Sequence, residues 1–135
     1  MRQFVKIVLL AAVVGITGSS AFAQKNTFDG KKIKETKEWK VEGKKKRLDH
    51  KTTYNADGKK VEEIEFTSVG DQKSRVTYEY NQKGKCVKET HYDEFDKLEK
   101  TVVIEYHENG KKRLESVYAP NNKLKHTKEF EYILE

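Results

Sequence analysis

Aromatic residues recur along this 135-residue chain with a constant period, and that period constrains the fold more than any other feature. The first series steps by 26 residues through Phe28, Tyr54, Tyr80, Tyr106 and Tyr132. The second series has the same period and consists of Phe66, Tyr92 and Tyr118, with Trp39 in a slightly shifted place. A chain that repeats at this length stacks one small structural unit on the next.

A residue that tolerates positive φ stands four positions after the aromatics of both series from Trp39 to Tyr118. These residues are Gly43, Gly58, Gly70, Gly84, Asp96, Gly110 and Asn122, and a lysine follows six of the seven. The position after the aromatic, where a type I turn favours Asn or Asp, is held in four copies by Asn55, Asn81, Asp93 and His107. The spacing predicts a three-residue hairpin loop with a bulge, in which a left-handed residue closes a type I turn. Pro120 stands at the next position of its loop, where the fixed φ of proline suits a type I turn.

The segments between these turns are short and rich in Tyr, Val, Thr and Ile, which is typical of β-strands. We expect eight strands after a frayed start at residues 24–28, namely residues 31–39, 45–54, 59–66, 74–80, 85–92, 98–106, 111–118 and 124–133. Because tight turns join consecutive strands, the prediction is an all-β fold, a single twisted antiparallel β-meander built from 26-residue hairpin repeats. A small closed barrel is the alternative.

The turns also predict which residues face one another across each hairpin. If residues 82–84 form a loop, then Tyr80 opposes Cys86 and Tyr78 opposes Lys88. The same rule at every turn places the even-numbered apolar residues, including the aromatics from Tyr54 onward, on one face of the sheet. Odd-numbered residues of opposite charge then meet on the other face. Examples are Lys51 with Glu63, Glu63 with Arg75, and Arg113 with Glu105.

Residues 1–23 have the pattern of a secretory signal peptide. Arg2 and Lys6 give a positive start, residues 4–16 form an apolar core, and residues 21–23 form a small-x-small cleavage site before Gln24. The apolar run is shorter than the ~20 residues that a membrane-spanning helix needs. We therefore expect an exported protein, periplasmic or secreted, whose mature domain covers residues 24–135 and has no membrane span. An N-terminal membrane anchor is the alternative.

Charge and side-chain chemistry exclude several classes of function. Without Arg2 and Lys6 the chain carries 26 basic and 22 acidic side chains, and their signs alternate, which argues against a nucleic-acid partner. Cys86 is the single cysteine and is expected to be a buried free thiol, with an intermolecular disulfide as the alternative. The four histidines are scattered, so the sequence predicts no metal site, no nucleophile with a positioned base and no cofactor. We expect a protein that is not an enzyme.

The pattern Tyr-Asn-x-x-Gly-Lys at residues 54–59 and 80–85, with a close copy at 106–111, resembles the YD-repeat (RHS-like) family. It is also similar to the MORN-variant repeats of exported bacterial proteins. The resemblance covers nearly all of the chain from Phe28 onward. It implies antiparallel β-strips or shells that serve as surface, scaffold, binding or antitoxin-like proteins. The chain departs from the YD pattern because Asp follows the aromatic only at Asp29 and Asp93.

The aromatic rows are the candidate binding residues, because exposed tyrosines stack on sugar rings or anchor protein partners. They are Tyr54, Tyr80 and Tyr106 along one margin of the sheet and Phe66, Tyr92 and Tyr118 along the other. The competing interpretation is that these rings form the packing core of the repeat. The sequence predicts a non-enzymatic module for envelope or surface interaction, or a scaffold, with an unknown protein or glycan partner. A glycan- or ligand-binding module that uses the tyrosine rows and an antitoxin-like protein are the alternatives.

Overall fold

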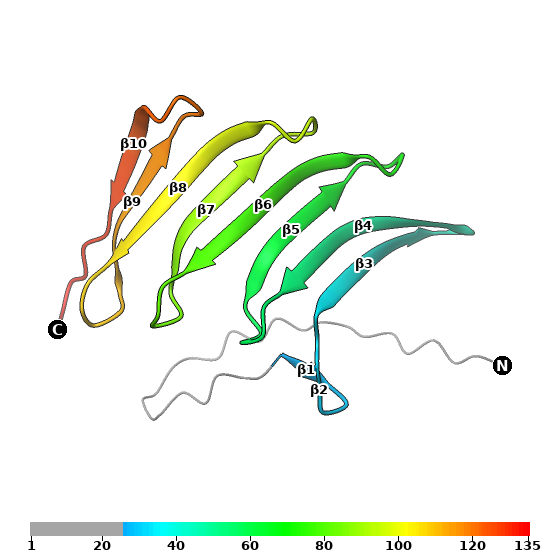
Figure 1. Ribbon diagram of the computed structural model, residues 1–135, viewed down its shortest axis with the longest axis horizontal. Helices are drawn as coiled ribbons and strands as arrows, with labels where there is room; N and C mark the ends of the chain where they lie inside the picture. Colours follow the sequence, from blue (N-terminus) through cyan, green and yellow to red (C-terminus); the bar gives the residue numbers. More distant parts are fainter. Residues whose placement is uncertain (1–25) are drawn as a thin grey trace.

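The computed structural model describes residues 26–135 as an open antiparallel sheet with a small hairpin beside it (Figure 1). The eight strands of the sheet follow one another in chain order and are β3 (Glu35–Glu42), β4 (Lys45–Tyr54), β5 (Lys60–Phe66), β6 (Gln72–Tyr80), β7 (Cys86–Tyr92), β8 (Leu98–Tyr106), β9 (Lys112–Tyr118) and β10 (Leu124–Glu129). This is the predicted all-β meander. The closed barrel is wrong, because β3 and β10 lie at opposite ends of the sheet. The predicted signal peptide lies outside the described residues.

The N-terminal part of the prediction needs correction. The expected strand at residues 31–39 is divided between β2 (Lys31–Lys32) and β3, and the expected frayed start contains β1 (Thr27–Phe28), which pairs with β2. Asp29 and Gly30 join β1 to β2 with φ of 49° and 72°. Two consecutive positive φ values make the tight turn that matches the twist of a hairpin, and Asp-Gly is a preferred sequence for it.

Six hairpin loops, from β4–β5 to β9–β10, have the predicted geometry. The closing residue of each has a positive φ, which ranges from 61° at Asp96 to 92° at Gly70. Its N–H donates to the carbonyl of the first turn residue, which directly follows the aromatic, as in Gly84 to Asn81 at 2.9 Å. The β3–β4 connection differs, because Glu42 pairs with Lys45 and leaves a two-residue loop.

A side-chain oxygen stabilises these loops from either of two positions. The Asn81 Oδ1 at the first position accepts the Lys85 N–H at 2.9 Å. The β8–β9 loop begins with His107, and there Asn109 Oδ1 accepts the N–H of Lys111 at 3.0 Å. The β9–β10 loop uses its third residue in the same way. The first position is therefore free to vary where an asparagine stands two residues later.

Every one of these six hairpins also contains a one-residue β-bulge in the strand that leaves the loop, beyond the loop itself, where the turn predicts a bulge. After Tyr80 pairs with Cys86, the register skips Val87, so that Tyr78 pairs with Glu89 and not with Lys88. The skipped residue lies seven positions after the aromatic in each hairpin, at Val61, Lys73, Val87, Glu99, Arg113 and Lys125. A bulge inverts the alternation of side chains, so the predicted even-numbered face holds along β4, β6 and β8 but is wrong along β5, β7 and β9, where odd-numbered residues take that face.

The bulges divide the two aromatic series between the two faces of the sheet. The register places Tyr54, Tyr80 and Tyr106 on the face of Val102 and Ile104, and places Phe66, Tyr92 and Tyr118 on the other face. The predicted margins are correct, because each series still precedes the loops of one edge. Two predicted charge pairs change as well: Arg75 binds Glu62 and Asp96, and Lys51 binds Glu35. Arg113 binds Glu105 at 3.0 Å as predicted.

The sheet is a single layer with a thin core, and Figure 1 shows its strands curving along their length. Among residues 26–135 the buried hydrophobic side chains are Val102 and Ile104, which are 8% and 4% exposed. Thr52 and Ser116 are the buried polar residues of the same part of the chain. The hydrogen-bonded ladders and cross-strand side-chain pairs therefore carry much of the stability.

Candidate functional site

We use the name tyrosine edge for the rim of the sheet at which the strands end and the loops 55–59, 81–85 and 107–111 lie side by side (Figure 1). This rim runs across the strand ends and is distinct from the edge strands β3 and β10. Tyr54, Tyr80 and Tyr106 each end the strand that enters one of these loops. Tyr132 continues the series in the C-terminal segment after β10. The opposite edge, with the loops 67–71, 93–97 and 119–123, carries the second aromatic series.

The tyrosine hydroxyls tie each hairpin to the one before it. Tyr80 donates to the Lys60 carbonyl at 2.5 Å and Tyr106 to the Cys86 carbonyl at 2.5 Å. Tyr132 repeats the contact with the Lys112 carbonyl at 2.8 Å, again 20 residues earlier in the chain. Burial raises the pKa of the Tyr80 and Tyr106 hydroxyls, which keeps them protonated and able to donate.

These tyrosines bridge places where neighbouring strands diverge. The ladder between β7 and β8 ends at the pair Lys88–Val103, although β8 continues to Tyr106. The ladder between β9 and β10 ends at the equivalent pair, Leu114–Glu129. The Phe130 N–H donates to the Arg113 carbonyl at 3.1 Å and extends the second ladder by one more pair. Beyond these contacts a groove opens between the adjacent hairpins at the tyrosine edge.

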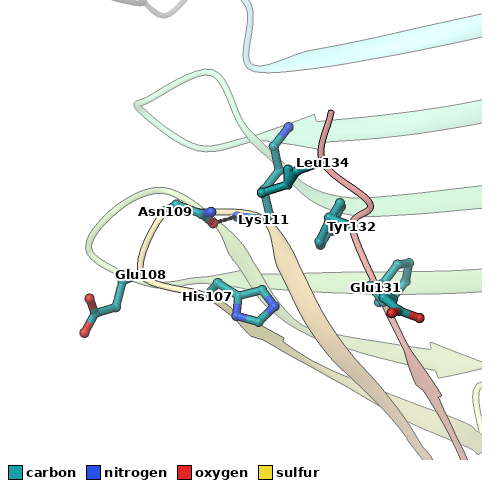
Figure 2. Close-up of a pocket in the computed structure, with 8 residues that line it drawn as sticks. His107, Glu108, Asn109, Lys111, Glu131, Tyr132 and Leu134 are labelled. Atoms are coloured by element: carbon teal, nitrogen blue, oxygen red, sulfur yellow. Dashed lines mark hydrogen bonds between the residues drawn. The ribbon is translucent and has the colours of Figure 1, made fainter.

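Two such grooves lie within residues 81–134. The inner groove has a volume of about 650 Å³ and lies between the loops 81–85 and 107–111, with Ile104 and Tyr106 in its wall. The C-terminal groove has a volume of about 760 Å³ and lies between the loop 107–111 and residues 130–134. Figure 2 shows the loop residues on one side of the C-terminal groove and Tyr132 on the other. The rings of His107 and Tyr132 meet edge to face, with centroids 6.3 Å apart.

Each groove carries charges of both signs. A Cβ atom added to Gly110 would lie 3.4 Å from Cε of Lys85, so this lysine crosses from one loop to the next. Lys59 makes the same crossing toward Gly84, and its Nζ lies 5.5 Å from the centre of the Tyr80 ring. Glu105 lines the inner groove and binds Arg113.

The second aromatic series does not join these grooves. Phe66, Tyr92 and Tyr118 are half-buried at the opposite edge, on the other face of the sheet. The Arg75 guanidinium lies 3.9 Å from the centre of the Tyr92 ring and donates to Asp96 at 2.7 Å. A cation of the protein itself therefore occupies one face of the Tyr92 ring.

The other candidate groups are engaged in local contacts. Cys86 is free and half-buried, and burial raises the pKa of its thiol, which disfavours the nucleophilic thiolate. Glu63 accepts hydrogen bonds from Lys60 and Tyr78. Desolvation of Glu63 opposes these bonds, but together they hold its pKa below the ordinary value. Within residues 26–135 no three His, Cys, Asp or Glu side chains form a group that could hold a metal ion.

Sequence reasoning selected Tyr106 but missed most of the residues that form the groove walls with it. The missed residues include Lys85, His107, Lys111 and Tyr132. The period of 26 residues is the signal that could have found Tyr132 and the two lysines, because each repeats a position of the preceding hairpin. His107 breaks the asparagine pattern of the loops, which is a weaker signal.

Comparisons with known proteins give no family. No family model matches the chain, and no curated protein matches it. Among solved structures, one described as the crystal structure of a GtfA/B complex bound to UDP and GlcNAc matches with a TM-score of 0.31 and 14% identity. The match covers 69% of this chain and 24% of that chain, so this protein spans about a quarter of the matched chain's length. A likeness this slight says nothing about function. In the described part of the chain, no helix is long and apolar enough to cross a membrane.

Proposed function

We propose that this chain is an exported, non-enzymatic interaction module of the bacterial envelope or cell surface, which holds a partner against its sheet. The single-layer construction carries the proposal. A sheet that buries two hydrophobic side chains in residues 26–135 leaves most of both faces accessible, which suits a surface for contact more than an enclosed reaction site. The alternating charges and rigid hairpin loops provide polar groups in fixed positions for such a contact.

Exposed apolar side chains at the loop tips support an interaction role. Val69 and Phe95 stand at equivalent positions of two loops on the opposite edge and are 81% and 72% exposed. Trp39 and Val41 are exposed near the β3–β4 connection. Large apolar residues held at the ends of rigid hairpins are suited to insert into a partner.

Binding to isolated envelopes tests this proposal. The full chain is expressed in a bacterium, and the processed protein is purified and sedimented with isolated envelopes. We expect an N-terminus at Gln24, because the predicted cleavage site precedes it, and saturable binding to the envelopes. An unprocessed protein in the cytoplasm that does not sediment with envelopes would refute the proposal.

A glycan- or ligand-binding function is the second candidate, and the two grooves at the tyrosine edge favour it. Each combines an aromatic ring with polar and charged side chains, which is the composition of many small-molecule sites.

A further inference from the structure

The two grooves are copies of one site. Each of the residues that line the C-terminal groove lies 26 positions after a residue that lines the inner groove. Tyr132, Glu131 and Lys111 thus stand where the inner groove has Tyr106, Glu105 and Lys85. Other equivalent positions differ, such as Asn81 and His107 or Ile104 and Phe130, so a ligand that occupies both grooves meets the same tyrosine, glutamate and lysine beside different neighbouring groups.

The spacing of the sites follows from the sheet. Equivalent hairpins are two strands apart, and hydrogen-bonded strands are 4.7–4.9 Å apart, which gives a repeat of about 9.5 Å within the ladders. The grooves at the edge repeat at slightly more than this, because the hairpins separate beyond the end of each ladder. A ligand that occupies both grooves at once must have an extended form with nearly the same repeat. In an extended β-1,4-linked glycan every second sugar has the same orientation, and one disaccharide is about as long as two strand spacings.

The groups in each groove suit a sugar ring. The tyrosine ring is held by its hydroxyl bond to the preceding hairpin, so it is already in place before a ligand binds. Tyr132 remains 44% exposed. An aromatic ring of this kind packs against the C–H face of a sugar. The lysine, glutamate and amide groups of the loops then reach the hydroxyl groups at the rim.

The same groups are less suited to other ligands. An anion would favour converging cations, but each groove is lined by glutamates as well as by lysines. A peptide that adds a strand to the sheet would use the free backbone of β3 or β10, at the ends of the sheet and not at its tyrosine edge.

We infer that the tyrosine edge binds an extended β-1,4-linked glycan, with one disaccharide for each groove. The inference rests on the proposed function and names the class of partner for it.

Oligosaccharides of defined length test the inference. Calorimetry measures the binding of β-1,4-linked oligomers of glucose and of N-acetylglucosamine with two, four and six sugars. For at least one series we expect the affinity to rise by about tenfold or more once the oligomer spans both grooves, because the second contact becomes intramolecular. The α-1,4-linked oligomers of glucose follow a curved path and should not show this rise. Equal binding of the α- and β-linked series, or β-linked affinities that do not rise with length, would overturn the inference.

Two substitutions test the location. His107 and Glu108 line both grooves. The double variant His107→Ala/Glu108→Ala should keep its fold, because Asn109 caps this loop and Ala119 naturally holds the first position of the β9–β10 loop. We expect this variant to lose about tenfold or more in affinity for the hexasaccharide. The matched control is Glu94→Ala, which changes the second loop position at the opposite edge and should bind like the unaltered protein.

The envelope assay separates this inference from the proposed function. If the protein sediments with envelopes but binds no oligosaccharide, and the double variant sediments equally well, the glycan inference is wrong and the interaction function stands. If the protein binds neither envelopes nor oligosaccharides, both are wrong. Lost oligosaccharide binding in a folded double variant, with binding retained in Glu94→Ala, supports the inference.

Discussion

Alanine substitutions at two loop glycines separate the cost of a backbone conformation from the cost of a packing contact. Gly58 and Gly70 close two consecutive hairpin loops with φ of 76° and 92°. An L-residue in this region costs about 1–2 kcal/mol, and Gly70→Ala should show this cost alone, because nothing lies within 4 Å of its added Cβ. At Gly58 the added Cβ would lie 2.9 Å from Cβ of Asn26 and 3.1 Å from its backbone nitrogen.

The N-terminal segment must therefore shift to accommodate Gly58→Ala. Overpacking of this kind costs about 1–3 kcal/mol. Added to the backbone cost of about 1–2 kcal/mol, this predicts a loss of about 2–5 kcal/mol at Gly58 against about 1–2 kcal/mol at Gly70. Urea denaturation followed by circular dichroism measures both free energies of unfolding.

A double-mutant cycle identifies the source of the difference. Asn26→Gly removes the nearest atom and should recover part of the extra cost of Gly58→Ala, which appears as a coupling energy between the two positions. Equal losses at Gly58 and Gly70, together with zero coupling, would refute the packing of the N-terminal segment against the β4–β5 loop.

Three further predictions concern hydrogen bonds. Tyr106→Phe removes a hydroxyl that donates to a backbone carbonyl and should lower the free energy of unfolding by about 1 kcal/mol, so an unchanged urea midpoint would contradict this bond. Asn109→Ala removes the oxygen that accepts the Lys111 N–H and should lower the free energy of unfolding by about 1 kcal/mol. His107→Ala should change the urea midpoint little. A larger loss for His107→Ala than for Asn109→Ala would contradict this hydrogen bond. Desolvation raises the pKa of Glu63, but hydrogen bonds from a lysine and a tyrosine outweigh it and lower the pKa in the folded protein. The ionised Glu63 therefore stabilises the fold fully above the ordinary pKa of 4.5, and this contribution is lost as the pH falls through the lowered folded-state pKa. Denaturation at several pH values should show a weaker acid dependence for Glu63→Gln, and identical pH profiles for the two proteins would disprove this role.

The order of strands and the position of the loops could be predicted because each loop depends on a few neighbouring residues. A left-handed closing residue favours Gly, Asn or Asp, and those residue types stand at Gly58, Asp96 and Asn122. The two edges of the sheet follow directly from the spacing of the loops. The first hairpins were predicted poorly, because β1–β2 and β3–β4 use two-residue loops outside the common period.

The faces of the sheet could not be predicted in the same way. The bulged residues include Val61, Lys73 and Glu99, which share neither charge, size nor polarity. A bulge is a property of the ladder between two strands and requires no particular side chain. The type of side chain therefore does not identify the bulged residue, although its distance from the preceding aromatic is constant.

The candidate site depends on the change of register at the bulges. The tyrosines at the loop margin were apparent from the period, but the grooves beside Tyr106 and Tyr132 exist because the ladders end before the strands β8 and β9 do. The partners of Arg75 changed for a related reason, since the bulge moved Glu63 to the other face and left Glu62 within reach. The sequence by itself determined the turns, the strand order and the period, which rest on the conformational preferences of single residues. Only the tertiary structure decided the faces, the charge partners and the grooves, because these depend on how whole strands pair.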